Sequence, residues 1–130
     1  SDRSWVISEP PHVGGLANAP TPLEYLLSGA LGCFAAVFAF YAAKWGVKYD
    51  TFEVSAKADL DVRGHMMEDA PPSGFQRVTI QVEVRASEQP DREALERVLE
   101  ATMQGCPGIS TLRDPVSLEA ELNVSTRMRR

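Results

Sequence analysis

Apolar and polar side chains alternate most regularly between Thr51 and Arg63, where every second residue is apolar. A period of two is typical of a strand with one buried face, so this segment is predicted to be a half-buried strand. Arg77 to Arg85 alternates in the same way beyond a proline-containing loop, Gly64 to Gly74, and the two strands are predicted to pair antiparallel. The inward positions are Phe52, Val54, Ala56, Ala58, Leu60 and Val62 in the first strand, and Val78, Ile80, Val82 and Val84 in the second.

Two further segments are predicted to be strands. Pro115 to Ser125 alternates near the end of the sequence, and Ser4 to Ser8 forms a short apolar run near its start. Glu9 to Pro22 is rich in proline and glycine, which favours an ordered loop. The inward positions of the late strand are Val116, Leu118, Ala120, Leu122 and Val124.

A long apolar stretch follows the loop and predicts a helix from Pro22 to Trp45. Proline suits the first helical turn, and Gly46 can end the helix. Apolar residues occupy its whole circumference, so we expect it to be buried on all sides. A monomer of this size can hardly enclose such a helix alone, which favours a homodimer. Several small residues would let other backbones approach: Ser28, Gly29, Ala30, Gly32, Ala35, Ala36 and Ala39.

The uncharged part of this helix, Leu26 to Ala43, also reaches the lower length limit of a membrane span. A buried central helix is the favoured interpretation, because the rest of the chain alternates like a soluble sheet and no cationic cluster flanks the stretch. We therefore expect no membrane partner.

Pro90 to Gln104 predicts a second helix, which is amphipathic. Leu95, Val98 and Leu99 follow the helical spacing on one face. Together the segments predict an α+β fold, with an antiparallel sheet packed around the long apolar helix and the amphipathic one. The length of 130 residues fits one domain, residues 1–130.

The net charge and the composition of residues 1–20 argue against some binding partners and cellular locations. The formal net charge is −5, which argues against an electrostatic grip on nucleic acid or anionic lipid. Residues 1–20 contain Glu9, two prolines and a Gly-Gly pair rather than a cationic start followed by an apolar run. We therefore expect a cytoplasmic protein whose cysteines are normally reduced.

The candidate chemistry rests on two cysteines, Cys33 in the apolar helix and Cys106 after the amphipathic one. Each one alone is more often a core residue than a nucleophile. They stand 73 positions apart, which is neither a CxxC motif nor a metal-binding spacing. His12 and His65 are isolated, and no phosphate-binding glycine motif or GxSxG motif occurs, so no metal site and no cofactor is expected.

Three stretches resemble the OsmC/Ohr family, the osmotically inducible and organic-hydroperoxide-resistance proteins. EPPHVGGLANAPTPLEYLLSGALGCF is similar to the leading motif, in which a Gly-Gly loop and a Pro-x-Pro helix start lead to a cysteine. SGFQRVTIQVEVRA is similar to the following strand, and QGCPGISTL to the second motif, a Cys-Pro after an acidic helix. The resemblance spans Glu9 to Val124 and implies the family fold, an intertwined dimer.

The resemblance also implies a mechanism. The cysteine that matches Cys33 is the peroxidatic one, whose thiolate attacks an organic hydroperoxide and becomes a sulfenic acid. The cysteine that matches Cys106 resolves it as a disulfide, and an external dithiol reductant restores both thiols. Apolar neighbours of Cys33, including Leu31, Phe34 and Phe38, would suit organic hydroperoxides better than hydrogen peroxide.

The activating residues depart from the family pattern. Peroxidase members carry a Glu ten positions before the first cysteine, and here that position is Leu23. Glu24 follows one step later and would point away from Cys33, because nine residues turn a helix by about 900°. The family's activating Arg lies upstream, where Arg3 is the only basic residue and is not expected to fill that role.

Two alternatives therefore stay open beside the peroxidase hypothesis. The protein could be a non-catalytic module that binds an apolar ligand or acts as a redox sensor, or both cysteines could be purely structural. A cation within reach of Cys33 would discriminate between these hypotheses, because an apolar surrounding alone raises a thiol pKa.

Overall fold

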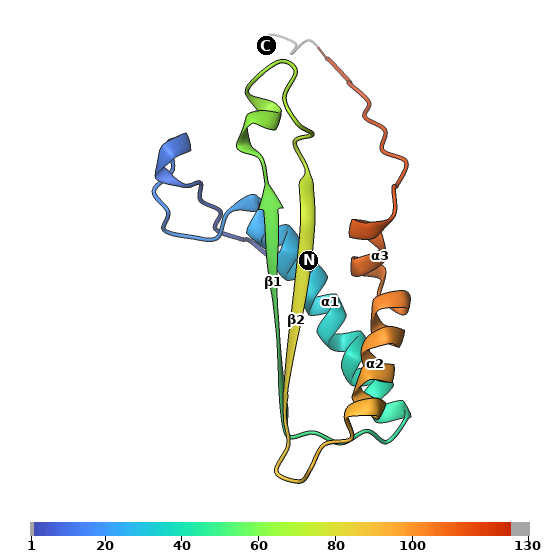
Figure 1. Cartoon of the computed structure of the whole chain (residues 1–130). Coiled ribbons are helices and arrows are strands. Elements are labelled where there is room, and N and C mark those ends of the chain that lie inside the picture. Colours follow the sequence, from blue (N-terminus) through green and yellow to red (C-terminus); the bar gives the residue numbers. More distant parts are fainter. Residues whose placement is uncertain (1, 126–130) are drawn as a thin grey trace.

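A computed structural model of the chain describes residues 2–125 and has an α+β fold, as the sequence predicts (Figure 1). Helix α1 packs against strand β1 of a long two-stranded ribbon and against helices α2 and α3 (Figure 1). Helix α1 is the one element that contacts both the ribbon and the other helices within the described residues. In chain order the elements are η1 (Pro11–Val13), α1 (Pro22–Lys44), β1 (Thr51–Leu60), η2 (Val62–His65), β2 (Phe75–Arg85), α2 (Arg92–Gly105) and α3 (Pro107–Arg113).

The ribbon confirms the antiparallel pairing that alternation predicts. Val54 pairs with Val82 and Ala56 with Ile80, and the half-buried positions alternate with exposed ones on both strands. Strand β1 ends three residues earlier than expected, because the Asp61 carboxylate accepts hydrogen bonds from the backbone N–H and the guanidinium of Arg63. These bonds close a 3-10 turn in place of the ladder.

Helix α1 begins at a capping box. The hydroxyl of Thr21 accepts a hydrogen bond from the backbone N–H of Glu24, and the Glu24 carboxylate accepts one from the N–H of Thr21. These bonds satisfy N–H groups that have no partner inside the helix. The helix ends at Lys44, and Gly46 follows with φ of 65°, a left-handed conformation that favours glycine.

The expectation that α1 is buried on all sides is wrong for the single chain. One face is buried, with Ala30, Phe34, Phe38 and Ala42 at four-residue intervals. Phe40 on another face is 60% exposed, and apart from the adjacent part of α1 no atom of the described residues lies within 4 Å of where β-carbons on Gly29 and Gly32 would be. Among residues 2–125, the elements that pack against α1 are the ribbon and helices α2 and α3, which leave this face uncovered.

Among the described residues α1 is the one helix long and apolar enough to cross a membrane. Of its most apolar stretch, 22% is buried within the chain. The core helix of a soluble protein can pass the same test of length and composition. Helix α1 packs against β1, α2 and α3.

The core lies where α1 meets α2, α3 and the ribbon. Phe38 is its aromatic centre, with ring centroids 5.0 Å from Phe52 and 6.1 Å from both Phe34 and Tyr49. Helix α2 confirms its predicted amphipathic character, and the Asp91 carboxylate caps its start by accepting a hydrogen bond from the N–H of Ala94. The other fully or nearly fully buried members of the core are Ala42, Val98, Cys106 and Ile109.

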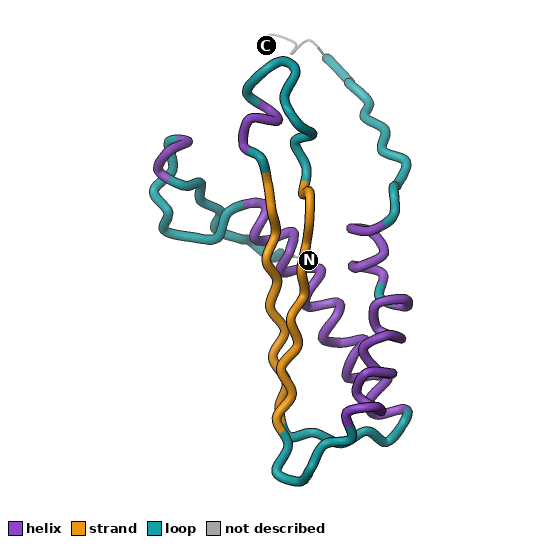
Figure 2. Tube along the Cα trace, in the orientation of Figure 1, coloured by secondary structure: helices purple, strands orange, loops and turns teal. Residues whose placement is uncertain are grey.

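Two predicted strands are absent from the described residues. Pro115 to Ser125 leaves α3 as an extended segment with no neighbouring strand, and Leu118 is 91% exposed (Figure 2). Ser4 to Ser8 is likewise irregular. Alternation marks a segment that can form a strand, but a strand also needs a neighbour for its backbone hydrogen bonds, and the single chain offers none here.

Candidate functional site

The fold brings together the two cysteines that lie far apart in the sequence. Cys33 lies in the middle of α1, and Cys106 forms the joint between α2 and α3. Both are free thiols, and the side chain of Cys33 is close enough to alter the pKa of Cys106. Sequence spacing could not predict this contact, which depends on α3 folding back onto α1.

Helix α3 was missed in the sequence because its seven residues carry no apolar period. Pro107 occupies its first position, where the missing N–H costs nothing. Ile109 is buried in the core cluster and holds the helix against α1. The side chain of Arg113 donates a hydrogen bond of 2.8 Å to the carbonyl of Met103, which ties the end of α3 to the last turn of α2.

The two thiols differ in burial, and burial affects the ionisation of Cys106. Cys106 is fully buried, whereas Cys33 is half-buried. Burial raises the pKa of Cys106 most strongly, because it disfavours the thiolate. The backbone N–H of Ile109 lowers this pKa, the thiol of Cys33 raises it, and the N–H of Gly108 lowers it. The net pKa is raised, so Cys106 is a protonated thiol at neutral pH.

Three arginines among the described residues form ion pairs with carboxylates away from the cysteines. Arg63 pairs with Asp61, and its guanidinium holds the pKa of Asp61 at about 2. Arg113 pairs with Asp114 besides contacting Met103. None of the hydrogen bonds or ion pairs within residues 2–125 joins an Arg or Lys to either cysteine. The activating cation that the sequence hypothesis requires is therefore not supplied by these interactions.

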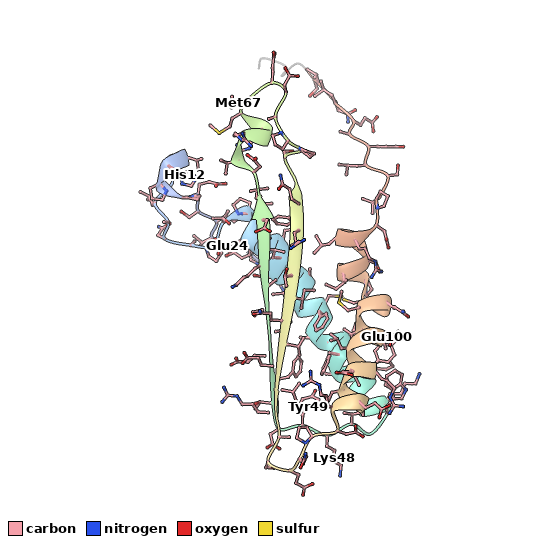
Figure 3. The ribbon with its side chains drawn as sticks, viewed as in Figure 1. His12, Glu24, Lys48, Tyr49, Met67 and Glu100 are labelled. Atoms are coloured by element: carbon pink, nitrogen blue, oxygen red, sulfur yellow. The ribbon has the colours of Figure 1, made fainter. Side chains whose placement is uncertain are left out.

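In the structure Glu24 is a capping residue at the start of helix α1 rather than a carboxylate beside Cys33. Its carboxylate belongs to the capping box at the start of α1, where Figure 3 shows it beside the N-terminal loop. Leu23 and Arg3 are both exposed. The Glu and Arg of the family pattern are thus not assembled at the thiols by residues 2–125.

The histidines do not form a metal site. His12 lies on the N-terminal loop, as Figure 3 shows, and His65 closes the turn after β1; both are exposed. No group of three or more His, Cys, Asp or Glu side chains gathers in metal-binding proximity within the part of the chain that the structure describes.

Two cavities open on the surface away from the cysteines. A cleft of about 1220 Å³ lies between the end of α1 and the start of α2, near Lys48 and Tyr49 (Figure 3). A smaller cavity of about 440 Å³ lies between β2 and α2, and its lining includes Phe38, Val84 and Leu95. Neither is lined by Cys33 or Cys106, so the larger cleft does not mark the thiol site.

Solved structures share this fold. An OsmC-like hydroperoxide resistance protein from Jannaschia sp. CCS1 is 24% identical, with a TM-score of 0.66 over 83% of this chain and 69% of that one. An OsmC-like protein from Mycoplasma pneumoniae is 18% identical, with a TM-score of 0.66 over 82% and 69%. An organic hydroperoxide resistance protein OsmC from Legionella pneumophila is 18% identical, with a TM-score of 0.58 over 82% and 72%.

Comparison with curated proteins gives no match. The sequence model of the family described as OsmC-like protein matches residues 15–121, which include both cysteines, the ribbon and all three α-helices. With the shared fold, this match over most of the chain shows that the protein belongs to the OsmC-like family.

Proposed function

We propose that this protein is a thiol-dependent peroxidase that reduces organic hydroperoxides, with Cys33 as the nucleophile and Cys106 as the resolving cysteine. The observation that carries the proposal is the packing of α3 on α1, which brings a half-buried free thiol near enough to a fully buried one to raise its pKa, without placing the two sulfurs at disulfide distance. The more accessible thiol suits the attack on a substrate. The buried, protonated thiol suits a second step that waits until the first is complete.

The proposed chemistry balances in three steps. The Cys33 thiolate attacks the terminal oxygen of the hydroperoxide, an S–O bond forms, the O–O bond breaks and the alcohol leaves with a proton. The sulfur of Cys106 then attacks the sulfenic acid of Cys33, which forms a disulfide and releases water. An external dithiol reduces this disulfide by thiol–disulfide exchange and is itself oxidised.

The apolar surroundings support an organic substrate. Phe34 is fully buried beside Cys33 in the sequence, and Phe38 lies one turn further along the same face of α1. The Legionella structure of the same fold is described as an organic hydroperoxide resistance protein. We propose a cytoplasmic location for this reaction, since an external dithiol requires a reducing compartment.

A homodimer is part of the proposal. The uncovered face of α1 carries Gly29, Gly32 and Phe40, and the extended Pro115–Ser125 segment exposes an alternating apolar row. Exposed apolar surfaces that are rimmed by polar residues are typical of interfaces. A second chain could cover both surfaces and also bring a cation to the thiols. Light scattering at micromolar concentration should give about twice the chain mass of 14.2 kDa, and Gly32→Leu should weaken the dimer; a stable monomer would contradict it.

The alternative hypothesis is a non-catalytic module that binds an apolar ligand or senses redox state. Two observations favour it: Leu23 stands where the family's Glu is expected, and a cavity between β2 and α2, lined by both apolar and polar side chains, lies outside the thiol site. The two hypotheses differ in whether Cys33 consumes peroxide faster than an ordinary thiol.

The test treats the reduced protein with one equivalent of cumene hydroperoxide, followed by thiol counting and mass spectrometry. The peroxidase hypothesis expects rapid loss of both thiols and a disulfide between Cys33 and Cys106. Cys33→Ser should consume no peroxide, and Cys106→Ser should stop at a sulfenic acid that dimedone traps. Hydrogen peroxide should react more slowly. Equal slow rates for the wild type and Cys33→Ser would remove the enzyme hypothesis and leave the binding module.

A further inference from the structure

Helix α3 approaches α1 closely at Gly108. A β-carbon at Gly108 would lie 3.0 Å from the Cβ of Cys33, 3.2 Å from the Cα of Ala30 and 3.4 Å from its carbonyl oxygen. Carbon atoms at optimal separation are about 3.5–4.0 Å apart. All three neighbours are rigid parts of α1, so a side chain at Gly108 could be accommodated only by moving α3 away by a few tenths of an ångström.

The same turn carries the resolving cysteine. Gly108 is two residues after Cys106, and its backbone N–H acts on the sulfur of Cys106. A shift of this turn therefore moves Cys106 relative to Cys33, which stays on α1. The buried Ile109 in the next position limits how far the turn can rotate instead of translating.

Gly105 offers a matched comparison on the other side of Cys106. A β-carbon there would lie 2.9 Å from the hydroxyl oxygen of Tyr41, which is the far end of a flexible side chain. Tyr41 can turn aside without moving either helix. Neither Gly105 nor Gly108 has a left-handed φ, so alanine fits the backbone conformation at both positions.

We propose that Gly108 is a positioning residue for the thiol pair: its missing side chain lets α3 lie against Ala30 and Cys33, and this approach sets the separation of Cys33 and Cys106. The inference rests on the proposed function for its role in turnover, but its geometric part does not need peroxide chemistry. Disulfide formation depends sharply on geometry. A misplacement of 1 Å can cost on the order of 100-fold in rate, so a few tenths of an ångström correspond to about threefold to tenfold.

The kinetic test compares Gly108→Ala with Gly105→Ala by stopped flow. In Gly108→Ala, sulfenic acid should form on Cys33 at the wild-type rate, whereas its conversion to the disulfide should slow about threefold to tenfold. Gly105→Ala should change neither rate. Equal effects of the two alanines on the second step, or a loss confined to the first step, would overturn the proposal.

A second measurement separates this inference from the proposed function. Equilibration with reduced and oxidised glutathione gives the effective concentration of one thiol at the other without any peroxide. It should fall by a similar factor in Gly108→Ala and stay unchanged in Gly105→Ala. If the wild type forms no sulfenic acid with peroxide but this difference remains, the peroxidase proposal fails and the positioning role stands. An unchanged effective concentration in Gly108→Ala refutes the positioning role.

A third variant covers the case in which Gly108→Ala folds poorly. Cys33→Gly removes the β-carbon that the new methyl group would meet first. In a double-mutant cycle, Cys33→Gly should then restore part of the thermal stability that Gly108→Ala loses. Strictly additive losses of stability would show that the close contact with Cys33 does not hold α3 in place.

Discussion

Replacing Phe38 by alanine tests the central packing of the molecule. Phe38 is 1% exposed. Its ring packs against Phe52 of the ribbon and against Tyr49 in the loop between α1 and β1. Removing a buried phenylalanine costs about 3–5 kcal/mol, since the lost transfer free energy adds to the cost of a cavity. The total stability of a domain is about 5–15 kcal/mol, so this one change should remove a large share of it.

Phe40→Ala is the matched control, because Phe40 has the same chemistry on the same helix but is 60% exposed. It should cost less than about 1 kcal/mol in the isolated chain. Urea unfolding followed by far-UV circular dichroism measures both. With a slope of about 1–3 kcal/mol per molar urea, a cost of about 3–5 kcal/mol for Phe38→Ala should lower the midpoint by roughly 1–5 M. A cost for Phe38→Ala no larger than that for Phe40→Ala in dilute protein would refute the assignment of the helix faces.

The same pair of variants also tests the proposed homodimer. A partner that covers Phe40 would make the cost of Phe40→Ala depend on protein concentration, since dimer dissociation is then linked to unfolding. The cost of Phe38→Ala arises within one chain and should stay the same at every concentration.

Three further predictions address the capping box, the ribbon and the buried thiol. Thr21→Ala should lower the free energy of unfolding by roughly 1 kcal/mol, because the N–H of Glu24 loses its acceptor; calorimetry of the variant checks this. Ile80→Asp should unfold the protein by placing a carboxylate on the inner face of the ribbon, whereas Thr79→Asp on the outer face should stay within about 0.5 kcal/mol; equal melting curves would contradict the register. The pKa of Cys106 is higher in the folded than in the unfolded protein, so its contribution to the free energy of unfolding is complete below the pKa of an unfolded thiol and is lost as the pH rises above that pKa. Urea unfolding of the reduced protein from pH 7 to 10 should therefore show a steeper loss of stability with pH in the wild type than in Cys106→Ala.

The sequence predicts correctly those elements whose periodic apolar residues pack against other elements of the same chain. The β1–β2 pairing and the amphipathic α2 follow from alternation and helical spacing, because their buried faces meet α1. Helix α3 escapes prediction because seven residues are too few for a period. Pro115–Ser125 is the opposite case, since its period is clear but the neighbour that would make it a strand is missing from the single chain.

The candidate site, too, can be predicted from the sequence only in part. The composition of α1 explains why Cys33 lies in apolar surroundings, but no local pattern places Cys106 beside it; that pairing came from the family resemblance alone. The contact requires the turn after Cys106, a buried Ile109 and the bare Gly108 together. Each is an ordinary residue in sequence, and only the packing of α3 on α1 gives them a joint role.

The electrostatics of Cys106 constrain the order of any redox cycle at this site. Burial raises its pKa, so at neutral pH it carries a proton and is a weak nucleophile toward an incoming oxidant. The N–H groups of Ile109 and Gly108 act against burial, because they stabilise the thiolate that must form at the moment of attack on an oxidised Cys33. A buried thiol that resists premature ionisation but has local donors for its thiolate suits the second step, while the half-buried Cys33 suits the first. Exchanging the two roles would require the fully buried sulfur to meet the substrate, which the packing of α3 against α1 prevents.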